Sequence, residues 1–361
     1  MLEAAVPLED WMIPRLLIAA AGIALTQPDV PEQRTGLTLE SVVTLEEHAA
    51  DPIGNVTRLA ISPAGVLAIP DQQSARVRLY TPEGRLIAAL GRKGAGPGEF
   101  ERVVAATFDD RGRLYVADAA LGRITRYSTE WELDTIFPSP QGYTADVVAG
   151  RTGLMISTSQ QHRIVKTDFD GRATSTHLPP DARMSLVPYW ASVSGYSCIE
   201  IRRDMIVASN LLYPAWRYAS QEATPRAFGT PPAFYIAPEP PERGRFAGER
   251  QRELPDWLRT LTVIDRLVAV NDSFIVVVQG RYDPEGSDFF RMEHSSLDIY
   301  DFEGSKLWEA VPAPGRILGS RQHLHVLLSE PPEGWRIGRY SVSRPSHPHD
   351  VRSGSSDADG R

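Results

Sequence analysis

Cysteine is almost missing from this chain, which has only Cys198 among its 361 residues. A single cysteine excludes an intrachain disulfide and a cysteine-rich metal site. The neighbouring residues Ser197, Ile199 and Ile201 are compatible with a β-strand. We therefore interpret Cys198 as a buried apolar side chain and not as a reactive thiol.

Dense runs of basic residues are also lacking. Aspartate and glutamate together number 46 against 38 lysines and arginines, which gives a net charge of −8. Proteins that attract nucleic acid electrostatically carry a basic face. The composition therefore predicts that nucleic acid is not a partner.

Familiar catalytic signatures are missing as well. The chain has no Gly-x-Ser-x-Gly motif of a serine hydrolase and no His-Glu-x-x-His motif of a metalloprotease. The nearest pattern to a metal site is His323 and His325, which an extended strand would place on one face. Two imidazoles are too few to hold zinc without further ligands, for which the candidates are His162, His177 and His294. The sequence thus favours a protein without catalysis or cofactor. A single divalent metal such as Ca or Zn is the alternative.

Long apolar runs are scarce. Residues 16–25 form an apolar stretch of ten residues, which is too short to span a bilayer as a helix. Arg15 precedes the stretch and small residues follow it, so residues 1–27 are predicted to be a secretory signal peptide. Acidic residues such as Glu3 are unusual there, and a start at Met12 would remove them. We expect a periplasmic or secreted protein with no membrane span. A buried or interfacial helix is the alternative.

The other end of the chain differs in composition from the rest. Residues 343–361 are mostly Ser, Asp, Arg, Pro, His and Gly, with Val351 as the only sizeable apolar side chain. A segment with so little to bury cannot offset the entropy cost of ordering. The sequence predicts a disordered tail over these residues.

Glycine and proline, by contrast, are plentiful and evenly spread, with 28 and 29 residues respectively. Between these turn residues, a short alternating pattern recurs. The clear copies are residues 76–80, 123–127 and 336–340, and weaker copies are residues 163–167 and 296–300. Alternation with a period of two predicts strands.

Six short apolar strands accompany this repeat, and glycine-containing turns follow or precede several of them. The apolar strands are residues 66–69, 114–117, 154–157, 205–208, 274–278 and 324–328. Units of 40 to 50 residues with about four strands each are typical of propeller blades. We therefore predict an all-β, six-bladed β-propeller over residues 36–342. The strand at residues 41–46 is expected to complete the sixth blade by pairing near residues 336–341.

The second of these units carries the most specific motif. It reads Gly-Ala-Gly-Pro-Gly-Glu-Phe at residues 94–100, then Leu-Tyr-Val-Ala-Asp at 114–118, then Arg123 and Ile124. This pattern resembles the NHL repeat of β-propellers, and the whole chain resembles exported six-bladed propellers of bacteria. The resemblance implies the fold but no activity. From the residues themselves, Asp118 is expected to accept backbone hydrogen bonds, and Arg123 to pair with such a carboxylate.

Two segments are longer than the repeat requires, residues 230–257 and 279–295. In a propeller, links between blades and middle hairpin loops share one face, so both segments should lie there with neighbouring aromatic residues. The candidate binding residues on this face are Tyr189, Trp190, Trp216, Arg217, Tyr282, Phe289 and Phe290, with Tyr213, Arg243, Arg245 and Arg281 nearby. The alternative is that these segments cap the channel and bury their own aromatic side chains.

These features favour a non-catalytic binding propeller, acting as a monomer, for a peptide, glycan or protein partner. The alternative is a metal-dependent hydrolase or lyase, since propeller enzymes such as lactonases and amidating lyases use a metal at the central channel.

Overall fold

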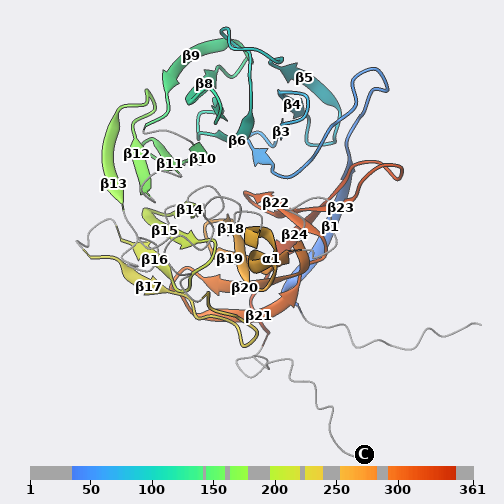
Figure 1. The fold of residues 1–361 in the computed structure, drawn as a ribbon. Coiled ribbons are helices and arrows are strands. Elements are labelled where there is room, and N and C mark those ends of the chain that lie inside the picture. The colour runs from blue at the N-terminus through green and yellow to red at the C-terminus, as the bar shows by residue number, and fades with distance from the viewer. Residues whose placement is uncertain are drawn as a thin grey trace, which may run out of the picture. The chain divides into compact units, whose positions relative to one another are not determined.

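The computed structural model describes residues 35–140, 144–158, 163–177, 196–219, 224–238, 253–282 and 292–346. These residues form six four-stranded antiparallel sheets. The sheets stand around a common axis as the blades of a β-propeller (Figure 1). The predicted fold class and number of blades are therefore confirmed.

Each blade is a meander whose first strand lies nearest the axis. Blade 1 contains β2 (Ala60–Ile61), β3 (Leu67–Asp71), β4 (Arg76–Tyr80) and β5 (Leu86–Leu90). Blade 2 contains β6 (Val103–Phe108), β7 (Leu114–Asp118), β8 (Arg123–Tyr127) and β9 (Leu133–Pro138). Blade 3 contains β10 (Thr144–Ala149), β11 (Leu154–Thr158), β12 (Arg163–Thr167) and β13 (Ala173–His177).

The other three blades follow the same order. Blade 4 contains β14 (Tyr196–Ile201), β15 (Asp204–Ser209), β16 (Ala215–Tyr218) and β17 (Arg226–Phe228). Blade 5 contains β18 (Val263–Val270), β19 (Phe274–Tyr282), β20 (Met292–Asp301) and β21 (Lys306–Pro312). Blade 6 contains β22 (Arg316–Ser320), β23 (Leu324–Ser329), β24 (Arg336–Val342) and β1 (Leu37–Thr44).

The sixth blade joins the two ends of the propeller. β1 runs antiparallel to β24, with Leu37 opposite Val342 and Thr44 opposite Arg336. The pairing continues beyond the strands, because the Leu45 amide donates to the Trp335 carbonyl at 2.9 Å. The first and last strands therefore share one sheet, so the ring is closed by backbone hydrogen bonds.

The core is divided among the blade interfaces. Six clusters of buried apolar side chains each lie mainly between two neighbouring blades. Side chains of one strand alternate between two clusters. In β7, for example, Leu114 and Val116 face blade 1, whereas Tyr115 and Ala117 face blade 3. The second strand of a blade is therefore covered on both sides, and this explains its unbroken apolar sequence.

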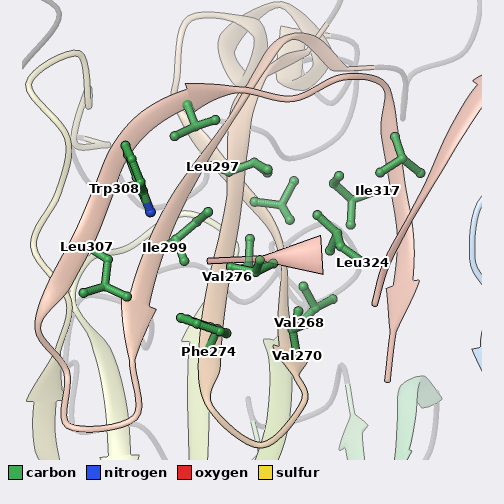
Figure 2. Packing of buried hydrophobic residues seen from close by; sticks show 14 residues of the cluster. Val268, Val270, Phe274, Val276, Leu297, Ile299, Leu307, Trp308, Ile317 and Leu324 are labelled. Atoms are coloured by element: carbon green, nitrogen blue, oxygen red, sulfur yellow. The ribbon is translucent and has the colours of Figure 1, made fainter. Parts of the chain in front are cut away.

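Figure 2 shows the cluster between blades 5 and 6. Val276, Leu297 and Ile299 of blade 5 meet Ile317 and Leu324 of blade 6 in it. These side chains are at most 2% exposed. Branched aliphatic residues suit such an interface because they pack closely on a pleated sheet.

Asp118 anchors the start of its blade. Its carboxylate accepts four backbone N–H groups, from Glu101 at 2.7 Å, Arg102 at 3.2 Å, and Ala120 and Leu121 at 3.0 Å each. The side chain is fully buried. The backbone-binding role predicted for Asp118 is therefore confirmed.

Arg123 has a different role from the one expected. Its guanidinium donates to the carbonyls of Ala95, Gly96 and Glu99, at 2.6 to 3.0 Å. It thus binds the glycine-rich link between blades 1 and 2, and these hydrogen bonds go to backbone oxygens instead of a carboxylate. The carboxylate of Asp118 is already occupied by amides, which explains why the expected pair is not formed.

The described residues cover only the first part of the predicted tail and none of the predicted signal peptide. The amide of Ser343 donates to the Gly36 carbonyl at 2.9 Å, and Arg344 contacts Asp301 at 3.4 Å. The first residues of the expected tail therefore contact the propeller. The predicted signal peptide and residues 347–361 lie outside the described residues. The one helix in the described ranges, α1 (Leu254–Arg259), has six residues, and no helix there is long and apolar enough to cross a membrane.

Candidate functional site

The meander gives the propeller two distinct faces. Turns that join the first strand to the second, and the third to the fourth, lie on one face, which we call the hairpin face. Loops that join the second strand to the third, and links between blades, lie on the opposite face, which we call the link face. The strand ends on either side of both long segments, β17 to β18 and β19 to β20, are therefore at the link face.

A cavity of about 330 Å³ lies along the axis, where the six first strands come together. Every blade contributes lining residues, for example Ile61, Phe108, Val148, Ile199, Leu267 and Leu318. The lining continues into the first hairpins of blades 2 to 6, at Asp110, Arg151, Arg202, Asp272 and Arg321. The cavity therefore reaches the hairpin face. Its volume is in the range of sites that bind small ligands.

The end of the cavity nearer the link face carries an ion pair across the axis. Arg58, just before β2 of blade 1, places Nη1 2.6 Å from Oδ2 of Asp146 in β10 of blade 3. The side chains are 34% and 14% exposed, respectively. Attraction by Asp146, with a smaller contribution from Asp265, raises the pKa of Arg58 above its ordinary value although the side chain is partly buried.

A second arginine beside this pair connects three blades. Nε of Arg266 lies 2.7 Å from Oδ2 of Asp265, its neighbour in β18. Nη1 donates to the Leu318 carbonyl of blade 6 at 3.1 Å, and Nη2 donates to the Thr57 carbonyl before blade 1 at 3.3 Å. We call Arg58, Asp146, Asp265 and Arg266 the axial charge cluster. Its two cations and two anions are balanced.

Charges of both signs also surround the mouth on the hairpin face. Nη2 of Arg321 in blade 6 lies 3.2 Å from Oδ1 of Asp110 in blade 2. Glu200 accepts the backbone amide of Arg151 at 2.9 Å. The guanidinium of Arg202 stacks on the Phe302 ring at 4.0 Å. A ligand entering here therefore meets hydrogen-bond donors and acceptors side by side.

Hydroxyl side chains fasten the cavity wall. Thr107 accepts the amide of Ala149 at 3.0 Å, which connects blades 2 and 3. Ser197 accepts the amide of Leu267 at 2.8 Å and so connects blades 4 and 5. In the same way, the Ser320 hydroxyl of blade 6 donates to a carbonyl of blade 5 at 2.8 Å. The wall is thus held by hydrogen bonds between blades and not only by packing.

The predicted binding residues are not all brought together. Arg217 pairs with Asp204 at 2.5 Å and stacks on the Phe302 ring at 4.3 Å. Asp204 begins β15 and Phe302 lies in the turn between β20 and β21, so both partners are on the hairpin-face side. Trp216 precedes it in β16 and is half-buried. Tyr282 is the last residue of β19, on the link-face side. Tyr189, Trp190, Phe289, Phe290, Arg243 and Arg245 lie outside the described residues, and Arg281 is exposed near the end of β19.

Tyr213 and its neighbours on the link face have a structural role. The Tyr213 hydroxyl hydrogen-bonds Gln279, and its ring meets Tyr235 edge-on at 5.0 Å. The Tyr235 hydroxyl in turn donates to the Leu211 carbonyl at 2.8 Å. Phe234 and Ile236, on either side of Tyr235, are 36% and 41% exposed. Sequence reasoning missed these two residues, although they alternate with a partly buried tyrosine as an anchored loop would require.

His323 and His325 have different surroundings. Nε2 of His323 lies 3.3 Å from Glu40, whereas His325 is 4% exposed with Nδ1 3.1 Å from the His323 carbonyl. Burial, helped by the Arg339 cation, lowers the pKa of His325 to about 4. His177 packs edge-on against the Tyr218 ring at 5.1 Å. Within the described ranges, no three His, Cys, Asp or Glu residues are placed to hold a metal ion together.

Cys198 lines the cavity wall but is only 2% exposed. Burial raises the pKa of its thiol. The interpretation of Cys198 as a buried apolar side chain is therefore confirmed.

Comparison with known proteins supports the fold. No protein-family model matches the chain, and no curated protein sequence matches it. Among solved structures, a member of the DUF4221 family from Bacteroides vulgatus has a TM-score of 0.63 at 8% identity, covering 86% of this chain and 98% of its own. A Bacteroides fragilis protein that is predicted to be exported has a TM-score of 0.57 at 12% identity, covering 85% and 96%. At such low identity the comparison shows a shared propeller fold and nothing about activity.

Proposed function

We propose that this chain is an exported, non-catalytic binding propeller whose ligand enters the axial cavity from the hairpin face. One observation carries the proposal: a single cavity is lined by all six blades and contains paired charges from blades that are not neighbours. The NHL-like motif of blade 2 and the signal-like residues 1–27 support an exported propeller of this kind. The periplasm or the extracellular space is the proposed location.

The wall of the cavity favours binding because it is already ordered. Hydrogen bonds between blades fix the first strands, so a ligand does not have to organise them. A preorganised site loses less conformational entropy when it binds. The polar groups at both ends of the cavity can then be used for orientation and selectivity.

We also propose the link face as a surface for a larger partner, a peptide, glycan or protein. Phe234 and Ile236 support this because a segment fixed by hydrogen bonds presents them to solvent. Trp216, Tyr189, Trp190, Tyr282, Phe289 and Phe290 remain predicted members of that surface. Arg217 is better assigned to the hairpin side, where its carboxylate partner lies.

Melting experiments with a ligand panel test the cavity. Purified protein is heated with free amino acids, short peptides, organic acids and oligosaccharides, each at up to about 10 mM, which detects dissociation constants in the millimolar range. At least one class should raise the melting temperature, and mass spectrometry should recover that ligand unchanged. Arg58→Met should abolish the shift, whereas Arg85→Met, at an exposed turn of blade 1, should preserve it. A panel without any shift would contradict the proposal, and a chemically converted ligand would point to the metal-dependent enzyme instead.

A further inference from the structure

The axial charge cluster indicates which class of ligand the cavity takes. Arg58 and Arg266 are cationic, and Asp146 and Asp265 are anionic, so no net charge is left at this end. Along the whole lining, five arginines face four carboxylates. A ligand with only negative charge would meet the carboxylates, and a ligand with only positive charge would meet the arginines. A ligand that carries both charges matches both kinds of group.

The guanidinium of Arg58 has further N–H donors for such a ligand. Its contact with Asp146 is made by Nη1, and a guanidinium has five N–H donors in a planar fork. A carboxylate can accept two of these in parallel. Asp146 is held in place from its other side, because Oδ1 accepts the Val147 amide at 2.9 Å.

The wall between the charges favours a peptide over a single amino acid. Each first strand pairs with one neighbour in its blade, so its other edge faces the axis. Such an edge presents backbone N–H and C=O groups to an extended segment, as in other peptide sites. Thr107, Ser197 and Ser320 bind three of these groups. Apolar lining residues such as Val148 and Leu267 can contact small side chains.

Resting on the proposed function, we infer that the axial cavity binds a short zwitterionic peptide with both termini free. Its carboxylate binds the Arg58 fork at the end nearer the link face, and its ammonium group binds the carboxylates that line the cavity toward the hairpin face, Asp110, Glu200 and Asp272. The backbone of the peptide lies against the edges of the first strands. Selectivity then comes from the terminal charges, since most of the wall groups are backbone atoms or small side chains.

Calorimetry with trialanine and matched compounds tests this inference. Trialanine should bind, and the same tripeptide with an acetylated amino end and an amidated carboxyl end should bind at least about tenfold more weakly. Raising the salt concentration should weaken trialanine binding, because the contacts are between charges. Arg58→Lys keeps the charge but removes the fork and should weaken binding about tenfold, whereas Arg85→Met should leave it unchanged.

Two results would overturn the inference without affecting the proposed function. One is equal binding of the free and blocked tripeptides, and the other is binding of maltotriose or succinate with no binding of trialanine. If Arg58→Lys does not fold, the salt dependence and the blocked peptide still decide the question with the natural chain. If no compound binds in calorimetry and no ligand of the panel raises the melting temperature, the cavity is not a binding site.

Discussion

In blades 1 and 2, one buried aspartate binds the backbone where the second strand ends. In blade 1, Asp71 accepts the amides of Gly54 and Ser74, and in blade 2, Asp118 accepts four amides. Both side chains are fully buried at the end of a second strand. The aspartates thus replace the strand partner that the backbone loses where the chain turns.

Asp118→Ala should strongly destabilise the protein. Removing the carboxylate leaves four amides without their acceptor, and water reaching the site can replace only part of the loss, so we expect about 3 kcal/mol less free energy of unfolding. Asp118→Asn keeps one acceptor oxygen and should lose roughly half as much. Urea unfolding measures both variants, and an Asp118→Ala loss below about 0.5 kcal/mol would contradict this role.

His325 should make the protein sensitive to acid. Its pKa lies near 4 in the folded protein and near 6.5 otherwise. Between these values the unfolded chain binds a proton that the folded chain does not, so stability is complete above about pH 6.5 and falls as the pH drops toward 4. The difference corresponds to about 3 kcal/mol.

His325→Gln, which does not titrate, isolates this effect. The free energy of unfolding of the natural chain, minus that of the variant, should decrease by about 3 kcal/mol between pH 7 and pH 4. Other titrating groups cancel in this difference. A difference that stays constant with pH would show that His325 is not held neutral by the fold.

At the scale of strands and turns, one hairpin of blade 1 contacts the closing strand. Gly84 has φ of +89°, and a Cβ added there would lie 2.2 Å from the carbonyl oxygen of Thr44 in β1. The Gly84 carbonyl also accepts the amide of Glu46 at 2.8 Å. This turn is therefore part of the contact between blade 1 and blade 6.

Gly84→Ala should cost more stability than the same change in the equivalent turn of blade 5. Gly304 has φ of +98°, but an added Cβ there would meet nothing closer than Phe228 at 3.5 Å. Both variants should lose about 1 to 2 kcal/mol from the left-handed backbone, and Gly84→Ala should lose roughly 2 kcal/mol more from the clash. Chemical denaturation of both proteins checks this, and equal losses would refute the contact.

At the scale of the whole propeller, stability depends on ring closure. Without β1, the outer edge of β24 would lose its backbone partners, and the buried Leu45 would leave the interface with blade 1. Removing residues 36–48 should lower the melting temperature by roughly 10 °C or more. Removing residues 347–361 should leave the melting temperature unchanged. An unchanged melting temperature after removal of residues 36–48 would show that the ring does not need this strand.

The strand pattern made the architecture predictable. The second strand of each blade is packed on both sides, so it reads as a short apolar run, and glycine marks the turns at nearby positions. The outer strands are harder to recognise because solvent faces them, as in β13, which is almost entirely exposed. The cavity was not predictable, because Arg266 and Thr57 meet across 209 positions of sequence. Arg217 was misplaced for a similar reason, since only the strand direction decides which face it approaches.

The sequence by itself therefore determined the six blades, because alternation and turn chemistry act over a few neighbouring residues. It also determined the low cysteine content and the acidic balance, which restrict the possible disulfides and partners. Only the tertiary structure decided where charges from blades 1, 3 and 5 meet, because the closed ring brings them to one axis. Ion pairs depend on distance in space and not on order in the chain.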